Sequence, residues 1–454
     1  MVVIDGEHYP PVIQGAFETL EAQGNSIAAA VMAGGKEKIS AEGLTHIGPV
    51  AVRSASDPRQ VLGDAILELR PDMVLDLSDE PVLDYRRRHQ MASVALFHQA
   101  PYAGADFRFD PPPRPRLAAA PSMAIIGTGK RTGKTAVAGY AARTLTAAGR
   151  KPIVVAMGRG GPEKPEVLRG DELSLTPADL LALAAAGRHA ASDYVEDAFL
   201  ARVPTVGCRR CGGGLAGAVD ITNVPQGIEI ANSLGGDLLL LEGSGASIPP
   251  AHADLTGLVI PAHVPDEYLV GYMGPYKLLL ADFVVVTMCE NPFGSPSQVS
   301  SITSRIKQAF RSTGDDGAPR EKLRVVRTVF RPTPSSDVDG ADVFVATTAP
   351  EVAGQAITRH LEEHHGCRVV GISHSLSDRK RLEAELEDIG GRADVLLCEI
   401  KAAAIDVATR RAVDAGLEVV YMDNVPFGIE GDDPREVIEW GAGIATERFT
   451  NGST

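Results

Sequence analysis

The stretch Gly127-Thr128-Gly129-Lys130-Arg131-Thr132-Gly133-Lys134-Thr135 decides the fold of this chain of 454 residues. It follows the apolar run 124–126, which predicts a buried strand, and it leads into the alanine-rich segment 136–148, which predicts a helix. A glycine-rich turn between a strand and a helix that begins Gly-Lys-Thr is typical of a phosphate-binding loop, whose backbone N–H groups face the phosphates. The residues that we expect to bind nucleotide are Gly127, Thr128, Gly129, Arg131, Thr132, Gly133, Lys134 and Thr135.

Two side chains of this loop have predicted roles of their own. Lys134 reaches the outer phosphates, and the hydroxyl of Thr135 is a ligand for Mg²⁺. The usual G-x-x-x-x-G-K-[ST] spacing puts its first glycine at position 128, which is threonine here. The alternative interpretation is an ordinary glycine-rich turn. The strand before the turn and the helix after it favour nucleotide binding.

The composition indicates an α/β protein with more than one domain. The chain is too long for one compact core, and 44% hydrophobic residues with 5% aromatic ones suit a soluble α/β protein. The formal net charge of −15 argues against a nucleic acid or an anionic membrane as partner. Five cysteines do not suggest a disulfide framework, and the first residues lack the features of a signal peptide. Since no apolar run reaches membrane-spanning length, we expect a cytoplasmic protein.

The pattern of strands, helices and prolines predicts two domains. Residues 1–110 form a small α/β domain, and the stacked prolines of 111–118 form a stiff linker. Residues 119–454 form a phosphate-loop NTPase core with a mostly parallel sheet and a C-terminal α/β extension. In the N-terminal domain a helix is expected at 11–22. The strands expected there are 2–4, 27–32, 73–77 and 94–97.

The C-terminal section leaves its own organisation open. Loop signals at 310–340, including 314–319 and 331–336, indicate a sub-boundary there. The strands expected beyond it are 343–346, 369–372, 395–398 and 418–422, alternating with helices. This section is either a third α/β unit or the outer half of the nucleotide domain's sheet. Its strand-end loops offer His374, Arg379 and Lys401 as candidate phosphate ligands, although each alone is more often a surface residue.

Loops at strand ends supply further candidates, because ligands in parallel sheets bind at the carboxyl ends of the strands. In the N-terminal domain these loops are 5–9, which carries His8, and 76–80; the alternative is that their acids cap helices. In the second domain a strand at 152–157 ends in a loop containing Arg159, Gly160 and Lys164, a candidate anion pocket.

Candidate metal-holding acids lie on both sides of the region 206–214. Asp171 or Glu172 is a candidate for reaching Mg²⁺, with a solvated loop acid as the alternative. Glu242 ends the apolar run 238–241, and beside a phosphate loop an acid at that position holds the metal or its water shell.

The stretch 206–214 has three interpretations. Arg209 and Arg210 lie among glycines and suit a doubly charged phosphate ligand, which guanidinium groups bind bidentately. Alternatively the stretch is a structural loop. In the third interpretation Cys208 and Cys211 are a metal or redox pair, although they supply only half of a tetrahedral zinc site.

The nucleotide base has one candidate contact. The strand 283–288 ends near Glu290, which we expect to touch the base. The chain has no [NT]-K-x-D motif for reading guanine, so adenine is the expected base.

Five stretches together are similar to cyclic 2,3-diphosphoglycerate synthetases, and the similarity spans nearly the whole chain. They are 4–11 (IDGEHYPP), 127–135, 207–217 (GCRRCGGGLAG), 242–245 and 287–290. The phosphate loop also resembles that of dethiobiotin synthetase, whose pattern is Gly-Thr, four residues, then Gly-Lys-Thr, so that Thr128 fits. By that resemblance Asp171 and Glu242 look like metal-holding acids, and 152–164 looks like a substrate strand and loop.

The resemblance implies an ATP-dependent ligase that closes 2,3-diphosphoglycerate into a cyclic phosphoanhydride, releasing ADP and phosphate. One substrate phosphate attacks the γ-phosphate of ATP, and the other then displaces the activated group. The cofactors implied are ATP and Mg²⁺, and a homodimer is the default assembly. Catalysis is assigned to Lys134, Lys130, Arg159 and Glu242. The predicted substrate ligands are Arg159, Gly160, Lys164, Arg209, Arg210 and His8.

Two other functions stay open at this point. A kinase that makes 2,3-diphosphoglycerate from 2-phosphoglycerate would use much the same site, and release of inorganic phosphate separates a ligase from it. A nucleotide-switched metallochaperone would use Cys208 and Cys211 as its metal site. That function predicts a preference for GTP, which the missing guanine motif disfavours.

Overall fold

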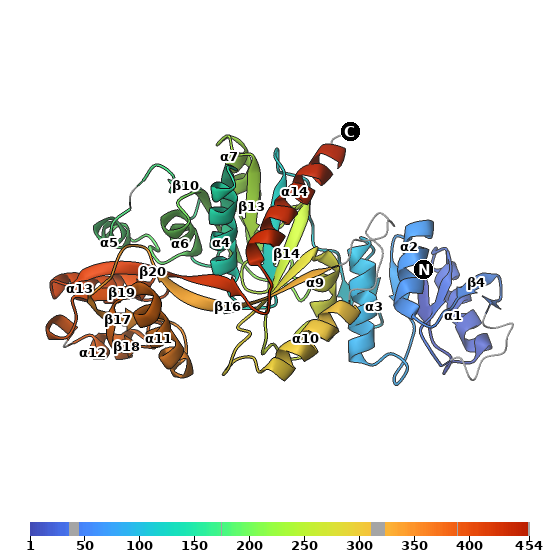
Figure 1. Cartoon of the computed structure of the whole chain (residues 1–454). Helices are drawn as coiled ribbons and strands as arrows, with labels where there is room; N and C mark the ends of the chain where they lie inside the picture. The colour runs from blue at the N-terminus through green and yellow to red at the C-terminus, as the bar shows by residue number, and fades with distance from the viewer. Residues whose placement is uncertain (36–44, 174, 310–322, 388, 453–454) are drawn as a thin grey trace.

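The computed structural model describes residues 1–35, 45–173, 175–309, 323–387 and 389–452. An N-terminal α/β unit has a sheet of its own, and the rest of the chain is built on a second, larger sheet. Figure 1 shows the N-terminal unit at one end of the molecule. This arrangement confirms the predicted fold class.

The N-terminal sheet has the strand order β3-β4-β2-β1-β5-β6-β7. Its central pairs are parallel, and the edge strands β3 and β7 run antiparallel to their neighbours. The strands are β1 (Val2–Ile4), β2 (Ala30–Met32), β3 (His46–Ile47), β4 (Val50–Arg53), β5 (Val74–Asp76), β6 (Tyr102–Ala103) and β7 (Arg108–Phe109). The helices are α1 (Pro10–Ala22), α2 (Pro58–Leu69) and α3 (Tyr85–Phe97).

The strand predicted at 94–97 was wrong, because these residues are the last turn of α3. Asp84 caps that helix by accepting a hydrogen bond from the backbone N–H of Arg87. All four residues of the run are buried. A short apolar run fits a buried helix end as well as a strand, so only its length and its cap could have distinguished the two.

The phosphate-loop sheet has β8 (Ser122–Gly127) at its centre, in parallel between β13 (Leu238–Glu242) and β14 (Leu255–Pro261). Its other strands are β9 (Pro152–Gly158), β10 (Glu166–Arg169), β11 (Pro204–Cys211), β12 (Ile221–Thr222) and β15 (Phe283–Thr287). The helices of this part are α4 (Lys134–Ala147), α5 (Pro177–Ala185), α6 (Asp193–Leu200), α7 (Val224–Asn232), α8 (Glu267–Val270), α9 (Gly274–Leu280) and α10 (Pro296–Ala309).

The C-terminal section continues this sheet through two long strands, β16 (Arg324–Pro334) and β20 (Glu418–Gly428). One end of β16 pairs in parallel with β15, and the other end pairs antiparallel with β20. The sheet then runs on to β19 (Val395–Glu399), β17 (Asp342–Ala346) and β18 (Arg368–Ser373). The helices here are α11 (Gly354–His365), α12 (Arg379–Glu385), α13 (Arg410–Asp414) and α14 (Pro434–Gly452), with short turns at 351–353 and 389–391 and a π-helix at 404–409. Figure 1 shows α14 returning to the phosphate-loop sheet, where it packs on α4 and β8.

The loop predicted at 331–336 was partly wrong, since Arg331–Pro334 belong to β16. That half of β16 has β20 as its partner, and Pro332 and Pro334 lie two residues apart on the ladder. A proline disturbs a strand least where its missing N–H would face away from the partner. The other loop signal, at 314–319, lies outside the described residues.

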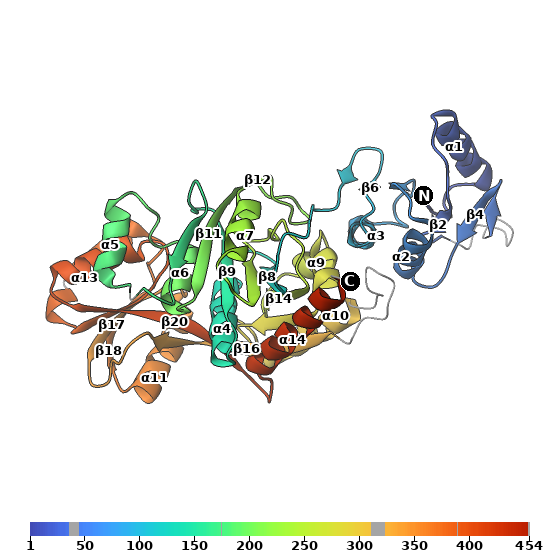
Figure 2. The same cartoon turned by 90° about the horizontal axis from the view of Figure 1, so that it is seen from above.

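The N-terminal unit contacts the phosphate-loop part through α3 and α9. Arg86 forms an ion pair with Glu267 at 3.0 Å, and the Gln90 side chain donates to the carbonyl of Val270 at 3.1 Å. Figure 2, seen from above, places this unit and the C-terminal helices α11 and α13 at opposite ends of the molecule. The described part of the chain has no helix with the length and apolar content needed to cross a bilayer.

Candidate active site

A cavity of about 670 Å³ lies over the phosphate loop. Its floor is the loop itself, from Lys130 to Ala136, and the end of β9. The opposite wall comes from the C-terminal section, with Thr348, Lys401 and Asn424 among its lining residues. The carboxyl ends of strands from both halves of the large sheet therefore face one shared space.

The backbone of the phosphate loop adopts a conformation that requires glycine at position 133. Gly133, at the N-cap of α4, has φ 90°, and a Cβ atom there would lie 2.3 Å from the ring of Phe330. Only glycine fits a left-handed turn under that ring. The Thr287 hydroxyl donates to the carbonyl of Thr132 at 2.9 Å and so fixes the loop to β15.

Lys134 is buried at the start of α4, and its ammonium donates to the carbonyl of Gly129 at 2.7 Å. Burial lowers the pKa of Lys134, while the nearby charges of Glu242 and Asp193 oppose that change. A buried cation at a helix N-terminus, surrounded by loop N–H groups, is suited to polyphosphate.

Glu242 ends β13 and is 3% exposed. Burial, reinforced by the charge of Asp193, raises its pKa from 4.5 to about 7, although a hydrogen bond with Thr135 acts in the other direction. Its Oε2 atom has no hydrogen-bond partner among the described residues. This carboxylate oxygen, which lies beside Thr135 of the loop, is available to bind a positively charged ligand.

The start of α6 brings a second carboxylate to this point, which sequence reasoning missed. Asp193 lines the cavity, and Glu196 and Asp197 follow it on the same helix as buried acids. The spacing i, i+3, i+4 places the three on one helix face, a signal that could have been noticed. Ser192, the residue before α6, also lines the cavity and has a buried hydroxyl without a partner in the described part of the chain.

Arg159 and Arg210 come together beside Gly245. A Cβ atom on Gly245 would lie 2.4 Å from Nη2 of Arg159 and 3.2 Å from Nη2 of Arg210. Arg210 donates to the carbonyl of Ser244 at 2.8 Å, and burial together with the charge of Arg159 lowers its pKa. Two adjacent guanidinium groups repel each other until an anion lies between them.

Most residues of the phosphate loop and its surroundings that we predicted do meet at the cavity. The predicted residues that line it are Lys130, Arg131, Thr132, Gly133, Lys134, Thr135, Arg159, Gly160 and Glu290. Glu290 is held in a bidentate ion pair by Arg331 of β16, so its carboxylate is already engaged. The candidate Lys401 also lines the cavity. Burial alone lowers its pKa, but the charges of Glu196, Glu399 and Asp423 outweigh that and raise it.

Other predicted residues are not brought to the cavity. Asp171 is bound by Arg169 at 2.7 Å, and Lys164 and Arg209 are exposed outside the cavity lining. His8 lies in the N-terminal unit, where its Nδ1 atom is 2.8 Å from the carboxylate of Asp5. We predicted these residues at the site from their positions in the sequence, but the fold does not bring them to the cavity.

Cys208 and Cys211 lie in the same strand, β11, three residues apart, and therefore face opposite sides of the sheet. Cys208 is buried, which raises the pKa of its thiol, whereas Cys211 is exposed. Within the described residues, no group of three histidine, cysteine or acidic side chains is arranged to hold a metal ion. This geometry does not favour a shared metal site on the two thiols.

Comparisons with known proteins match nearly the whole chain. Residues 1–110, 122–313 and 334–425 match the N-terminal, P-loop and C-terminal domain models of cyclic 2,3-diphosphoglycerate synthetase. The cyclic 2,3-diphosphoglycerate synthetase of Methanothermobacter thermautotrophicus is 44% identical over 94% of this chain and 92% of its own length. That of Rubrobacter xylanophilus is 45% identical over 95% of both, and that of Thermococcus kodakarensis is 42% identical over 99% of both.

Proposed function

The chain belongs to the cyclic 2,3-diphosphoglycerate synthetase family, and we propose that the cavity over its phosphate loop is the site of the reaction. The enzyme is an ATP-dependent ligase that closes 2,3-diphosphoglycerate into a ring. The observation that carries the assignment of the site is that Arg159 lines the same cavity as Lys134 and lies beside the guanidinium of Arg210 at Gly245. A substrate with two phosphates and a carboxylate needs such a concentration of positive charge.

The two reactants occupy two different parts of the cavity. The triphosphate of ATP lies along the loop, with Lys134 at its outer phosphates and Lys130 and Arg131 at the rim. The diphosphate substrate lies between this loop and Arg159, with Gly160 giving close approach. Positioning and charge neutralisation are the main contributions of the protein, because phosphate oxygens are already nucleophilic at neutral pH.

Ring closure proceeds in two displacements. An oxygen of one substrate phosphate attacks the γ-phosphorus of ATP, and the bond from that phosphorus to the β-bridging oxygen breaks to release ADP. An oxygen of the other substrate phosphate then attacks the phosphorus of the first substrate phosphate, which now carries the former γ-phosphoryl group. The former γ-phosphoryl group leaves as inorganic phosphate and takes with it the oxygen that first attacked.

The oxygen donors around the loop fit Mg²⁺, which prefers hard oxygen ligands. The hydroxyl of Thr135, the unpaired Oε2 of Glu242 and the carboxylate of Asp193 are the groups that would hold it or its water shell. When bound, the ion neutralises charge on the phosphates. Asp193 takes the place that we expected for Asp171.

The metal assignment predicts opposite results for two aspartates. Asp193→Asn is expected to lower turnover about 10- to 100-fold and to raise the Mg²⁺ concentration needed for half-maximal rate. Asp171→Asn removes an exposed pair with Arg169 and is expected to leave both values within about twofold. Rates measured across a Mg²⁺ titration check this. Equal losses in the two variants would contradict the assignment.

Glu242→Gln is expected to stabilise the nucleotide-free protein while lowering turnover about 10- to 100-fold. The folded chain holds the proton of Glu242 more tightly than the unfolded chain, since its pKa is raised from 4.5 to about 7. Stability is therefore lost as the pH rises through that interval, and the full penalty applies above it. The gain in melting temperature over wild type should be larger at pH 8 than at pH 5. The same gain at both pH values would contradict the buried charge.

Three further features belong to this proposal. The enzyme works in the cytoplasm, which its five free cysteines support. It forms a homodimer, the commonest assembly of soluble homo-oligomers. The domains are 1–110 and 119–454, joined by the linker 111–118.

The reaction itself is tested by phosphorus NMR of the enzyme with ATP and 2,3-diphosphoglycerate. A cyclic phosphoanhydride, ADP and inorganic phosphate are expected in equal amounts. ADP formation at the same rate without 2,3-diphosphoglycerate would contradict the coupling.

A further inference from the structure

Lys277 is a buried ammonium that the reaction described above does not use. It lies in the last turn of α9 and is 4% exposed. Its Nζ atom donates to the carbonyl of Gly127, the residue at which β8 ends and the phosphate loop begins, at 3.4 Å. The side chain therefore approaches the loop from the α9 side, and Lys277 is absent from the residues that line the cavity.

The surroundings of Lys277 supply little negative charge. Burial, and after it the positive charge of Lys134, lowers its pKa to about 8, and no acid in the described part of the chain offsets these two effects. The other buried lysines of the region differ, because Lys134 has Glu242 and Asp193 nearby and Lys401 has three carboxylates. The groups that favour the charge of Lys277 are the Gly127 carbonyl and the C-terminal end of α9.

A buried cation without a counter-ion destabilises the folded chain. The missing negative charge is available from the other side of the loop, where the triphosphate of ATP lies. In a protein interior, solvent and salt screen a charge only weakly over several ångströms. The ammonium of Lys277 and the phosphates of ATP, which lie on opposite sides of the loop backbone, therefore attract each other.

We propose that Lys277 is a positioning residue for ATP, whose charge acts on the triphosphate through the Gly127 end of the phosphate loop. The nucleotide supplies the counter-charge that the described residues do not provide. Lys277 thus destabilises the folded protein without nucleotide and stabilises its complex with ATP. The inference rests on ATP binding at the loop in the proposed function and is independent of ring closure.

Two variants separate the charge from the hydrogen bond. Lys277→Met removes both, whereas Lys277→Gln keeps an N–H donor for the Gly127 carbonyl without the charge. In both variants we expect the Kd for ATP to rise about tenfold and the Kd for ADP to rise less, since ADP carries one charge fewer. The melting temperature without nucleotide should rise. Calorimetric titration and thermal unfolding measure these quantities.

Thr287→Val is the matched control, because it removes an uncharged hydrogen bond from the same loop. It should raise the Kd values for ATP and ADP by the same factor and lower the melting temperature. The inference is overturned if the Lys277 variants behave in that way, or if their Kd for ATP equals that of wild type. Wild-type protein that binds no ATP would overturn the proposed function as well, which distinguishes the two failures.

Discussion

Lys134→Met is expected to lower turnover about 10³-fold while the protein stays folded. The ammonium lies at the start of α4, where it now donates to the carbonyl of Gly129 and can turn to the outer phosphates. Because Lys134 is a buried cation that lines the cavity, we expect it to stabilise the charge that develops during transfer of the γ-phosphoryl group. Methionine keeps the length of the side chain without the charge, so the loss reports on electrostatics. Steady-state rates at saturating ATP and 2,3-diphosphoglycerate measure it.

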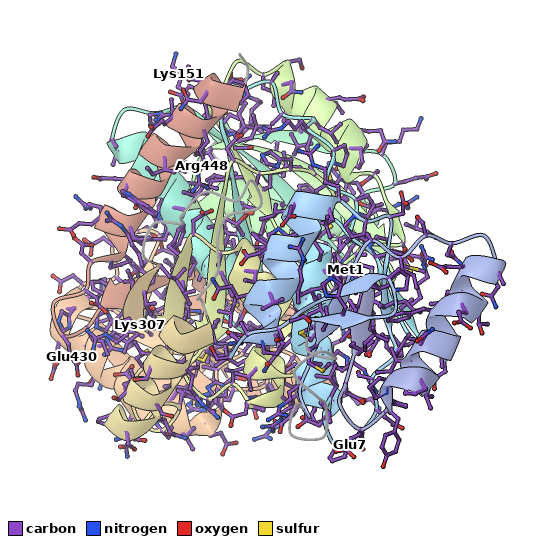
Figure 3. All side chains as sticks on the ribbon, turned by 90° about the vertical axis from the view of Figure 1, so that its right-hand side faces the viewer. Met1, Glu7, Lys151, Lys307, Glu430 and Arg448 are labelled. Carbon is purple, nitrogen blue, oxygen red and sulfur yellow. The ribbon has the colours of Figure 1, made fainter. Side chains whose placement is uncertain are left out.

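Lys151→Met is the control for this substitution. Lys151 is an exposed lysine directly before β9, and Figure 3 shows it at the edge of the molecule. Its loss should change turnover by less than about twofold. If Lys134→Met kept more than a tenth of the wild-type rate, the loop would not be where the γ-phosphoryl group is transferred.

Arg159→Ala is expected to lower kcat/KM for 2,3-diphosphoglycerate about 10²- to 10³-fold and to leave the Kd for ATP within about threefold. The guanidinium lies beside that of Arg210 at Gly245, on the part of the cavity assigned to the substrate. Two phosphates that repel each other must be held together there, and removing one of two adjacent cations weakens that hold most in the transition state. Initial rates and calorimetric titration with ATP separate the two effects.

Arg209→Ala is the matched control, because Arg209 is an exposed arginine on β11 that, unlike Arg159, does not line the cavity. We expect its kcat/KM to stay within about threefold of wild type. Equal losses in the Arg159 and Arg209 variants would contradict the position assigned to the substrate.

The phosphate loop and Glu242 could be predicted from the sequence because each is encoded locally. A glycine-rich turn between a strand and a helix indicates the phosphate loop, and an acid at the end of a fully apolar run indicates the position of Glu242. The family could be recognised for the same reason, since its distinctive stretches are contiguous.

Other features depend on contacts between distant segments, which no local pattern contains. The run 94–97 could be a strand or a helix until its burial in α3 is known. Asp193 replaces Asp171 as the acid at the cavity because α6 packs beside β9 and β11, whereas Asp171 is held by Arg169. The importance of Lys277 could not be predicted, because only the packing of α9 buries its ammonium against the loop.

The measurement that tests the proposed site chemistry most directly is the fate of ¹⁸O placed in the phosphate oxygens of 2,3-diphosphoglycerate. If one substrate phosphate attacks the γ-phosphorus, and the other substrate phosphate then displaces the former γ-phosphate from the phosphorus of the first, each inorganic phosphate released carries one ¹⁸O atom. Its phosphorus NMR signal shifts accordingly. Unlabelled inorganic phosphate formed together with the cyclic product would contradict the two displacements assigned to this cavity.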